Sequence, residues 1–229
     1  MTKLLLFRGS PRSNIDEVEN ENPHIMKECD ILNIRYCFEF DAYKWARDYF
    51  LNNKEYDYLL IATDDIIVKP EHIIQLKEDI NDFKFAVISG MMNVDEIDYP
   101  NGNLNICSVL ALKDKKLRQY DWLDITRLPK DDIFLVKFSG FPLMAIRRDI
   151  VEMFPFATDS IFKGKGMQFG ASLDFVFCWY CHEYNVPIYV DKRIFMHHLR
   201  NHGKHQAGER KKEIWLNDKM IQFGMNPIS

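Results

Sequence analysis

The chain has 229 residues, of which 47% are hydrophobic and 28% are charged, as in one globular domain that buries its own core. Its formal net charge of -4 argues against whole-chain attraction to nucleic acid or to an anionic membrane. No apolar run approaches the roughly 20 residues that cross a bilayer. The apolar run at Leu4–Phe7 is shorter than a signal-peptide core of about 7–15 residues, so we expect a cytoplasmic protein.

Short apolar runs in the first hundred residues predict buried strands. These runs are Leu4–Phe7, Tyr58–Ile61 and Phe85–Ile88. The first is followed by a turn-like Arg-Gly-Ser-Pro-Arg segment, and the third is expected to end at Ser89-Gly90. A fully apolar run of four residues is typical of a strand covered on both faces.

Amphipathic segments between these runs predict helices. Asp41 can cap a helix whose apolar residues recur at helical spacing: Ala42, Trp45, Ala46, Tyr49 and Phe50. Pro70 suits the first turn of a second helix, from Glu71 to Ile80. The acidic stretch from Asn14 to Asn22 reads as a loop or a frayed helix. Strands that alternate with helices indicate an α/β sheet with helices on its faces.

The second half is richer in strand signals, expected at Asn105–Leu112, Ile133–Phe138, Leu143–Ile146 and Ile188–Val190. Ser172 can cap a helix that runs to about Tyr184, and from Lys192 the chain is basic and histidine-rich. A last helix is expected from Glu209. The pattern Cys178-Phe-Trp-Cys181 falls inside the expected helix without a second cysteine pair. We therefore interpret both cysteines as small buried hydrophobic residues.

Two carboxylates stand where a buried strand ends, in the segment Thr63-Asp64-Asp65, which we call the acidic loop. Open α/β sheets bind ligands outside the carboxyl ends of their strands. Neighbouring residues on an extended chain point in opposite directions, so one carboxylate can face a metal ion and the other a ribose. A turn with a helix cap is the structural alternative. The pair Asp131-Asp132 precedes its strand and reads as a solvated turn.

Four segments resemble, in order, the GT-A-fold glycosyltransferases, especially the family-2-like nucleotide-sugar enzymes. They are Ala46-Arg47-Asp48, the acidic loop with its preceding strand and the following Pro70-Glu71, the glycine-containing Phe138–Arg148, and Ser172-Leu173-Asp174-Phe175 with the later His197-His198-Leu199. The resemblance covers about residues 1–200. It implies one α/β GT-A (Rossmann-like) domain over 1–200, with a mixed, mostly parallel central sheet flanked by helices. Residues 201–229 would form a basic tail or helix packed on or covering the donor site.

The implied activity is the transfer of a sugar from a nucleotide-diphosphate donor to an acceptor hydroxyl, with Mn²⁺ or Mg²⁺ and with inversion at the sugar. The acceptor would be a glycan, a lipid or a protein, and nucleic acid is not an expected partner. By the same resemblance Asp174 is the general base and Asp65 the metal ligand. His198 or His197 is a second metal ligand, and His198 is favoured because it follows Asp191 by seven residues and precedes Leu199.

Six further residues are expected to bind the donor: Arg8, Arg12, Arg47, Thr63, Asp64 and Gly140. Thr63 stands where the family carries its first acidic residue. A threonine can hydrogen-bond a ribose but is a poor metal ligand, so Asp64 would have to share that work. The glycine-containing loop from Phe162 to Gly170 lacks a P-loop pattern and reads as a mobile lid near the acceptor.

Two other functions compete with a glycosyltransferase. A nucleotidyltransferase-like enzyme on a related fold would carry a glycine-rich, basic turn after its first strand, and this chain offers only Arg8-Gly9-Ser10-Pro11-Arg12 there. A non-catalytic module that binds nucleotide sugars or carbohydrates would keep the fold without turnover, and Thr63 favours that alternative. In the basic tail, a solvated surface, a zinc site or a nucleic-acid patch compete with closure over the donor diphosphate.

Overall fold

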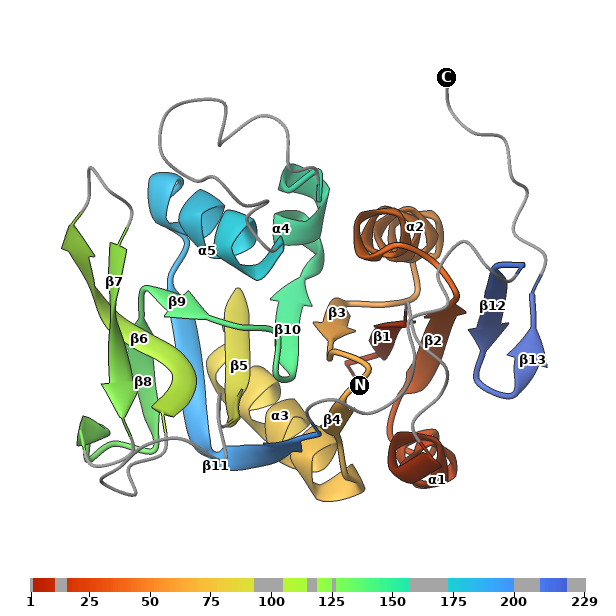
Figure 1. The fold of residues 1–229 in the computed structure, drawn as a ribbon, viewed down its shortest axis with the longest axis horizontal. Coiled ribbons are helices and arrows are strands. Elements are labelled where there is room, and N and C mark those ends of the chain that lie inside the picture. The colour runs from red at the N-terminus through yellow and green to blue at the C-terminus, as the bar shows by residue number, and fades with distance from the viewer. Residues whose placement is uncertain are drawn as a thin grey trace.

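The computed structural model describes residues 2–10, 16–92, 105–114, 119–124, 127–156, 173–199 and 211–221. A ten-stranded mixed sheet forms the centre of the molecule, with strand order β13-β12-β2-β1-β3-β10-β5-β11-β4 and with β8 paired to β11 (Figure 1). Its strands are β1 (Leu4–Ser10), β2 (Asp30–Arg35), β3 (Tyr58–Ile61), β4 (Ile66–Ile67), β5 (Val87–Met92), β8 (Ile133–Val136), β10 (Met144–Arg147), β11 (Ile188–His198), β12 (Glu213–Leu216) and β13 (Lys219–Met220).

Strands β1, β2, β3, β5 and β11 run in the same direction and form the parallel core of the sheet. Strands β2 and β3 pair in parallel with β1, and β11 pairs in parallel with β5. Strand β10 lies antiparallel between β3 and β5 and joins the two parallel groups. The carboxyl ends of the five parallel strands therefore meet at one edge, where open α/β sheets bind ligands.

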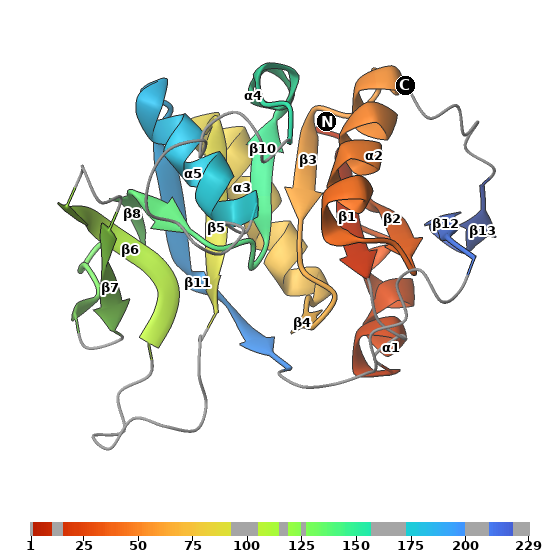
Figure 2. The ribbon, with the colours of Figure 1, turned by 45° about the horizontal axis from the view of Figure 1, so that its top comes forward.

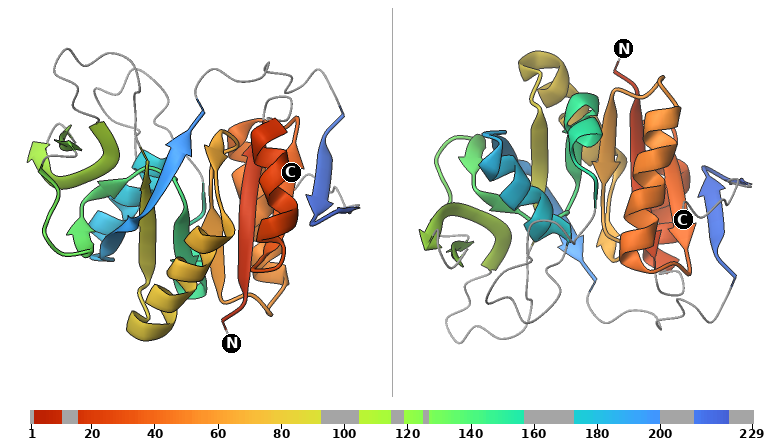
Figure 3. Two further views of the ribbon diagram at one scale, coloured as in Figure 1. Left: turned by 90° about the horizontal axis from the view of Figure 1, so that it is seen from below. Right: turned by 90° about the horizontal axis from the view of Figure 1, so that it is seen from above.

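Helices cover both faces of the sheet. They are α1 (Asp16–Ile25), α2 (Glu39–Asn52), α3 (Pro70–Phe83), α4 (Arg148–Met153) and α5 (Leu173–Glu183). Figure 3 shows α1 and α3 on one face and α2, α4 and α5 on the other. This arrangement confirms the expected α/β fold, a mixed sheet with a mostly parallel core flanked by helices. No helix in the described part of the chain is long and apolar enough to cross a membrane.

A three-stranded sheet lies beside the main one, with order β7-β6-β9. It consists of β6 (Asn105–Asp114), β7 (Gln119–Asp124) and β9 (Phe138–Ser139). Figure 2 shows β6 and β7 at the side of the molecule next to β8, far from β12 and β13 at the opposite side.

Strand β3 and residues Leu4–Phe7 of β1 are wholly apolar, as expected of strands whose two faces are both covered. All four residues of β3 are buried, and Leu5 and Leu6 of β1 are fully enclosed. Burying one such side chain stabilises the fold by about 1.5–3 kcal/mol. The core strands are therefore the elements that the sequence predicts best, and β3 has the predicted bounds.

Two glycines that suggested turns lie inside strands instead. Strand β5 continues through Gly90 to Met92, and β1 continues through Gly9 to Ser10. A Cβ atom at Gly90 would lie 2.7 Å from both Cγ2 and the carbonyl oxygen of Ile194 in β11. Gly90 is therefore required for the close approach of two strands, and the predicted strand end at Ser89-Gly90 is wrong.

The structure also corrects two helix predictions. Helix α2 begins at Glu39 with Phe38 as its N-cap, so Asp41 lies inside the first turn and does not cap the helix. The helix expected from Glu209 is wrong over Glu213–Leu216, which forms β12 and pairs antiparallel with β2. The open edge of β2 offers backbone hydrogen bonds, which outweigh the local helical preference. Coverage of the donor site by residues 201–229 stays a prediction.

Candidate active site

The acidic loop follows β3 directly, at the edge where the parallel strands end. Asp65 is buried, and its Oδ1 accepts a hydrogen bond of 2.8 Å from the hydroxyl of Thr63. Thr63 therefore contributes by fixing the orientation of the Asp65 carboxylate. Strand β4 begins at the next residue, so the loop is held between two strands.

The far end of β11 lies against this loop. His198 pairs with Ile66 and His197 with Ile67 in the antiparallel ladder between β11 and β4. Beyond the ladder, the Leu199 amide donates a hydrogen bond of 2.6 Å to the Asp65 carbonyl oxygen. The backbone of the predicted metal-ligand histidines thus lies next to Asp65, although the two segments are far apart in the sequence. The side chains of both histidines lie outside the described residues.

Arg8 is a buried strand residue, not part of an exposed loop. Its side chain is 2% exposed, and Nη1 donates a hydrogen bond of 3.1 Å to the Ile66 carbonyl oxygen. Arg8 therefore supports β4 immediately after the acidic loop. Arg12, which we also expected to bind the donor, lies outside the described residues.

An aromatic cluster, formed by Tyr43, Phe7, Phe141 and Phe156, lies beside the acidic loop. The ring of Tyr43 contacts Phe7 edge-on at a centroid distance of 5.0 Å and stacks on Phe141 at 5.6 Å. Phe156 lies 5.9 Å from the same ring. The cluster joins α2 and β1 to the segment after Gly140 and to the chain that follows α4.

Acidic residues from three elements act on the Tyr43 hydroxyl. Burial raises its pKa well above the usual value, and the negative charges of Glu39, Asp174, Asp64 and Asp65 add to that shift. The acidic loop and the start of α5 therefore converge on one buried phenol, which stays neutral at physiological pH. The charges of Asp174, the expected general base, and of Asp65, the expected metal ligand, therefore both reach this hydroxyl.

Asp174 lies in the first turn of α5, and its Oδ1 accepts a hydrogen bond of 2.7 Å from the Phe175 amide. One turn later, the Cys178 thiol donates to the Ser139 carbonyl oxygen at 3.2 Å, and its sulfur accepts from the Ser139 amide at 3.5 Å. These contacts fix α5 against the segment that contains the buried Gly140. Asp174 is therefore positioned by a helix tied to the glycine segment.

The buried cysteines confirm the interpretation of the Cys178-Phe-Trp-Cys181 pattern. Both thiols are fully enclosed and free, and burial raises the pKa of Cys181. The raised pKa of the Cys181 thiol is the opposite of the lowered pKa of a reactive cysteine.

The side chain of Arg47 connects α2 to the end of α4. Its Nε donates to the carbonyl oxygens of Val151 and Phe154, at 3.1 and 2.8 Å, and Nη2 donates to that of Glu152 at 2.9 Å. These carbonyls belong to the last turn of α4 and its flank, which have no helical partner of their own. The geometry therefore does not support the expected donor-phosphate contact of Arg47.

Tyr43 was not among the residues expected at the site. It belongs to the buried side of α2 together with Ala42, Ala46 and Phe50, where an aromatic residue reads as ordinary core. The sequence feature that could have identified Tyr43 is its hydroxyl, since a tyrosine on an apolar helix face usually needs a hydrogen-bond partner for that group.

The carboxylate oxygens of the acidic loop suit a hard cation that also binds phosphate. Among the side chains that the structure describes, no three His, Cys, Asp or Glu residues gather closely enough to hold a metal by themselves. Mg²⁺ usually takes one or two carboxylates and completes its shell with phosphate oxygens and water. Asp65 and Asp64 fit that pattern, and their metal role remains a prediction.

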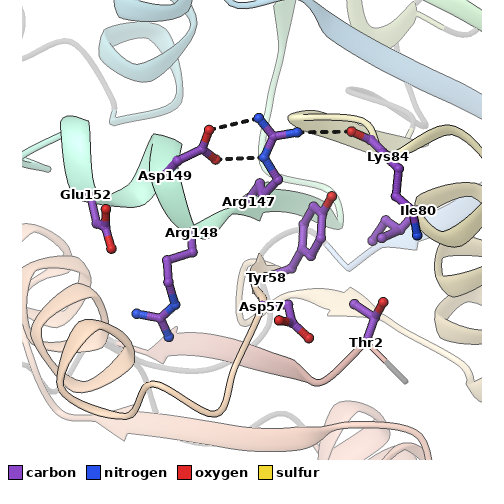
Figure 4. A pocket seen from close by; sticks show the side chains of 9 residues that line it. All are labelled: Thr2, Asp57, Tyr58, Ile80, Lys84, Arg147, Arg148, Asp149 and Glu152. Carbon is purple, nitrogen blue, oxygen red and sulfur yellow. Dashed lines mark hydrogen bonds and ion pairs between the residues drawn. The ribbon is translucent and has the colours of Figure 1, made fainter.

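A cavity of about 740 Å³ opens at the opposite end of the sheet, and we call it the amino-end cavity. Figure 4 shows its nine lining residues: Thr2, Asp57, Tyr58, Ile80, Lys84, Arg147, Arg148, Asp149 and Glu152. Arg147 forms a two-point ion pair with Asp149, at 2.7 and 2.8 Å. Arg148 donates to the carbonyl oxygens of Tyr56, Phe50 and Asn53. Both guanidinium groups are thus engaged with the protein, which makes this cavity a poor anion site.

No protein-family model matches the chain, and no curated protein matches it. Among solved structures, the fold is similar to A197 from STIV, with 16% identity, a TM-score of 0.54, and coverage of 99% of this chain and 100% of A197. S. aureus TarS 1-349 in complex with UDP-GlcNAc is similar at 11% identity and TM-score 0.49, over 90% of this chain and 61% of that one. A glycosyltransferase involved in the glycosylation of the major capsid of PBCV-1 is similar at 8% identity and TM-score 0.45, over 91% and 100%. At these identities the likeness supports the fold alone.

Proposed function

We propose that the chain is a metal-dependent glycosyltransferase that uses a nucleotide-diphosphate sugar. The pairing of β11 with β4 is the observation that carries this proposal, because it brings His197-His198 to the acidic loop as the motif resemblance requires. Asp174 would supply the acid–base group, and its charge, like that of Asp65, acts on the Tyr43 hydroxyl.

The acidic loop would bind the diphosphate of the donor together with Mn²⁺ or Mg²⁺, with Asp65 as the main ligand. Such an ion supplies Lewis-acid stabilisation of the departing nucleoside diphosphate. Thr63 orients the Asp65 carboxylate through its hydroxyl, and Arg8 supports the adjoining strand through the Ile66 carbonyl. These two contacts preorganise the loop before a ligand arrives.

Asp174 would act as the general base. It removes the proton of the acceptor hydroxyl while that oxygen bonds to the anomeric carbon and the bond from that carbon to the diphosphate oxygen breaks. The leaving group takes the bonding electrons, and attack from the opposite face inverts the anomeric centre. Such a base contributes about 10²–10⁴-fold to the rate.

A non-catalytic nucleotide-sugar-binding module is the second candidate. Thr63 is the observation that favours it, because its hydroxyl already bonds Asp65 where the related enzymes carry a second carboxylate. A nucleotidyltransferase-like enzyme is the third candidate, and it would release pyrophosphate from a nucleoside triphosphate instead of transferring a sugar.

Calorimetry with UDP, GDP and a panel of UDP- and GDP-sugars, with and without Mn²⁺, tests the proposal. We expect binding that requires the metal, followed by slow hydrolysis or transfer of the donor sugar. Asp65→Asn should abolish the metal dependence. Asp131→Asn, an equal change of charge at an exposed turn, should not. Tight binding with no hydrolysis or transfer would favour the module, and absence of binding would overturn the proposal.

A further inference from the structure

Strand β11 is interrupted by a bulge before it reaches the acidic loop. It pairs with β5 up to Val190 and again from Phe195, so that residues 191–194, which we call the β11 bulge, lie opposite Gly90 alone. Gly90 leaves room for this bulge, because a Cβ atom there would lie 2.7 Å from the Ile194 carbonyl oxygen. After the bulge, β11 turns toward β4 and pairs with it (Figure 1). The shape of the bulge therefore determines where the end of β11 lies.

Polar side chains hold the β11 bulge on two flanks. Arg193 folds back on Asp191, with its Nε 2.9 and 3.0 Å from the two carboxylate oxygens, and its amide donates to Oδ1 at 2.8 Å. Its Nη2 donates both to Asp191 Oδ2 at 2.8 Å and to Oδ1 of Asp79 in α3 at 2.9 Å. On the other flank, the Lys192 amide donates to the Asp132 carbonyl oxygen at 2.9 Å, and its Nζ lies 3.4 Å from the Asp132 carboxylate. We call Asp79, Asp191 and Arg193 the bulge cluster.

One oxygen of the bulge cluster lacks a donor. The Asp79 side chain is 3% exposed, and no group in the described part of the chain donates to its Oδ2. Its Oδ1 already accepts from Gln75 at 3.2 Å and from Arg193. The carboxylate of Asp191 is fully buried and is bonded by the same Arg193 nitrogen, so two acids lie together with one cation between them. A proton on Asp79 Oδ2 removes the repulsion and gives that oxygen a hydrogen to donate to Asp191.

The surroundings of Asp79 favour this proton near neutral pH. Burial, followed by the hydrogen bond and the charge of Asp191, raises the pKa of Asp79 to about 7, and the charge of Arg193 opposes the shift. Where α3 approaches the segment after α1, Lys77 and Glu28 are bonded to each other at 2.8 Å. Asp79 therefore changes its charge within the physiological range, inside the contact that holds the β11 bulge.

We propose that the bulge cluster is a positioning device for the candidate active site, which holds the end of β11 against the acidic loop while Asp79 carries its proton. When that proton passes to solvent, two buried carboxylates share one arginine. Their repulsion loosens the β11 bulge and, beyond it, the contact of the Leu199 amide with the Asp65 carbonyl oxygen. Metal-dependent binding of the donor then weakens. This inference rests on the function proposed above and gives that function a pH dependence.

The variant Asp79→Asn tests the inference, because Asn keeps the shape of the protonated acid and does not titrate. Hydrogen–deuterium exchange measures the backbone amides of residues 194–199, and calorimetry measures the affinity for UDP and GDP with Mn²⁺. Wild type and variant are compared at the same pH, so that titrations common to both cancel. We expect them to agree at about pH 6. At about pH 8, wild type should exchange faster over 194–199 and bind the nucleotide at least about 5-fold more weakly than the variant.

Asp30→Asn is the matched control. The Asp30 carboxylate of β2 accepts hydrogen bonds from the Tyr56 hydroxyl at 2.8 Å and from the Asn217 amide at 2.9 Å. Burial favours its protonation, but these bonds outweigh that effect and lower the pKa of Asp30, so it stays ionised over the same range. Its replacement should lower the unfolding midpoint at every pH and leave both pH profiles parallel to those of wild type.

Two results would overturn the inference. The first is equal exchange over residues 194–199 in wild type and Asp79→Asn at every pH. The second is a difference in exchange without a difference in nucleotide affinity, since the bulge cluster would then only connect α3 to β11. Wild type that binds neither nucleotide would refute the proposed function instead, and the exchange profiles would still decide whether the proton on Asp79 holds the end of β11.

Discussion

The two ends of the central sheet differ in how their charged side chains are arranged. At the amino-end cavity, cations and anions alternate, and Arg147 and Arg148 are bound to Asp149 and to backbone carbonyls. At the carboxyl end, the negative charges of Glu39, Asp64, Asp65 and Asp174 all act on the Tyr43 hydroxyl. Paired charges stabilise a folded chain, whereas gathered like charges repel one another. The carboxyl end therefore gathers carboxylates from several elements, whereas the two arginines of the amino-end cavity are bound within the fold.

The largest effect should come from Asp174→Asn at the carboxyl end. If Asp174 is the base, the transfer rate should fall by about 10²–10⁴-fold while the donor still binds, because Asn cannot accept the proton. Initial rates of sugar transfer and calorimetry of donor binding measure the two quantities. Wild-type turnover by this variant would show that Asp174 is not the general base.

Arg148→Ala should lower the stability of the fold and leave activity unchanged, in contrast to Asp174→Asn. The guanidinium donates to the carbonyls of Phe50, Asn53 and Tyr56 and lies 4.3 Å from the Phe50 ring centroid. Its removal leaves these groups without their donor, so we expect the free energy of unfolding to fall by about 2–3 kcal/mol. Urea denaturation checks the value. Activity per folded molecule should not change, and a loss of donor affinity would contradict the assignment of this end to structure.

Asp79→Asn tests whether gathered carboxylates always mark a ligand site. Asp79 of α3 and Asp191 of β11 are buried together and share Arg193, which bonds Asp79 at 2.9 Å and Asp191 at 2.8 Å. Burial and the Asp191 carboxylate raise the pKa of Asp79 to about 7. Here a proton on Asp79 and the Arg193 guanidinium offset the repulsion between the two carboxylates. The three side chains therefore connect α3 to β11.

The sign of the pH dependence follows from this raised pKa. The folded chain holds the Asp79 proton up to about pH 7, and the unfolded chain releases it near pH 4. The contribution of Asp79 to stability therefore falls as the pH rises from about 4 to about 7. Asn mimics the protonated acid and does not titrate. As the pH rises from 5 to 8, the free energy of unfolding of Asp79→Asn should therefore increase relative to that of wild type, by about 1.4 kcal/mol for each unit of the pKa shift. Thermal unfolding across this range measures the difference, and parallel curves would contradict it.

Arg147→Met should have the smallest effect. Its ion pair with Asp149 is largely exposed, with side-chain exposures of 38% and 53%. Exposed pairs contribute about 0–1 kcal/mol, so the unfolding midpoint should move little and activity should be retained. A larger loss, measured in the same urea experiment as Arg148→Ala, would indicate that the amino-end cavity has a role beyond structure.

Local signals were sufficient for the elements that are buried on both faces. Strand β3 has the predicted bounds, α3 begins at the Pro70 that predicts its first turn, and α5 lies where helical spacing predicts it. Strand β2 was missed because Asp30–Arg35 mixes Asn33 and charged ends with its apolar residues. Strand β12 was predicted as a helix because its state depends on the open edge of β2 and not on its own residues.

The site was predictable where it depends on strand ends and unpredictable where it depends on tertiary contacts. The acidic loop follows a clear buried run, so its place at the sheet edge could be inferred. Arg47 was placed near a phosphate because the sequence does not show that α4 ends beside it. Tyr43 was overlooked because its neighbours Phe7 and Phe141 come from distant segments.

The pairing of β11 with β4 also has a consequence for the order of folding. The hydrogen bond from Leu199 to Asp65 closes a loop on the order of 130 residues, a contact of high sequence separation. During synthesis, the acidic loop leaves the ribosome long before the strand that confines it. A nascent chain can therefore pair β1, β2 and β3 early but cannot complete the candidate site until β11 has been made. Activity, if the proposed function holds, would be one of the last properties that the chain acquires.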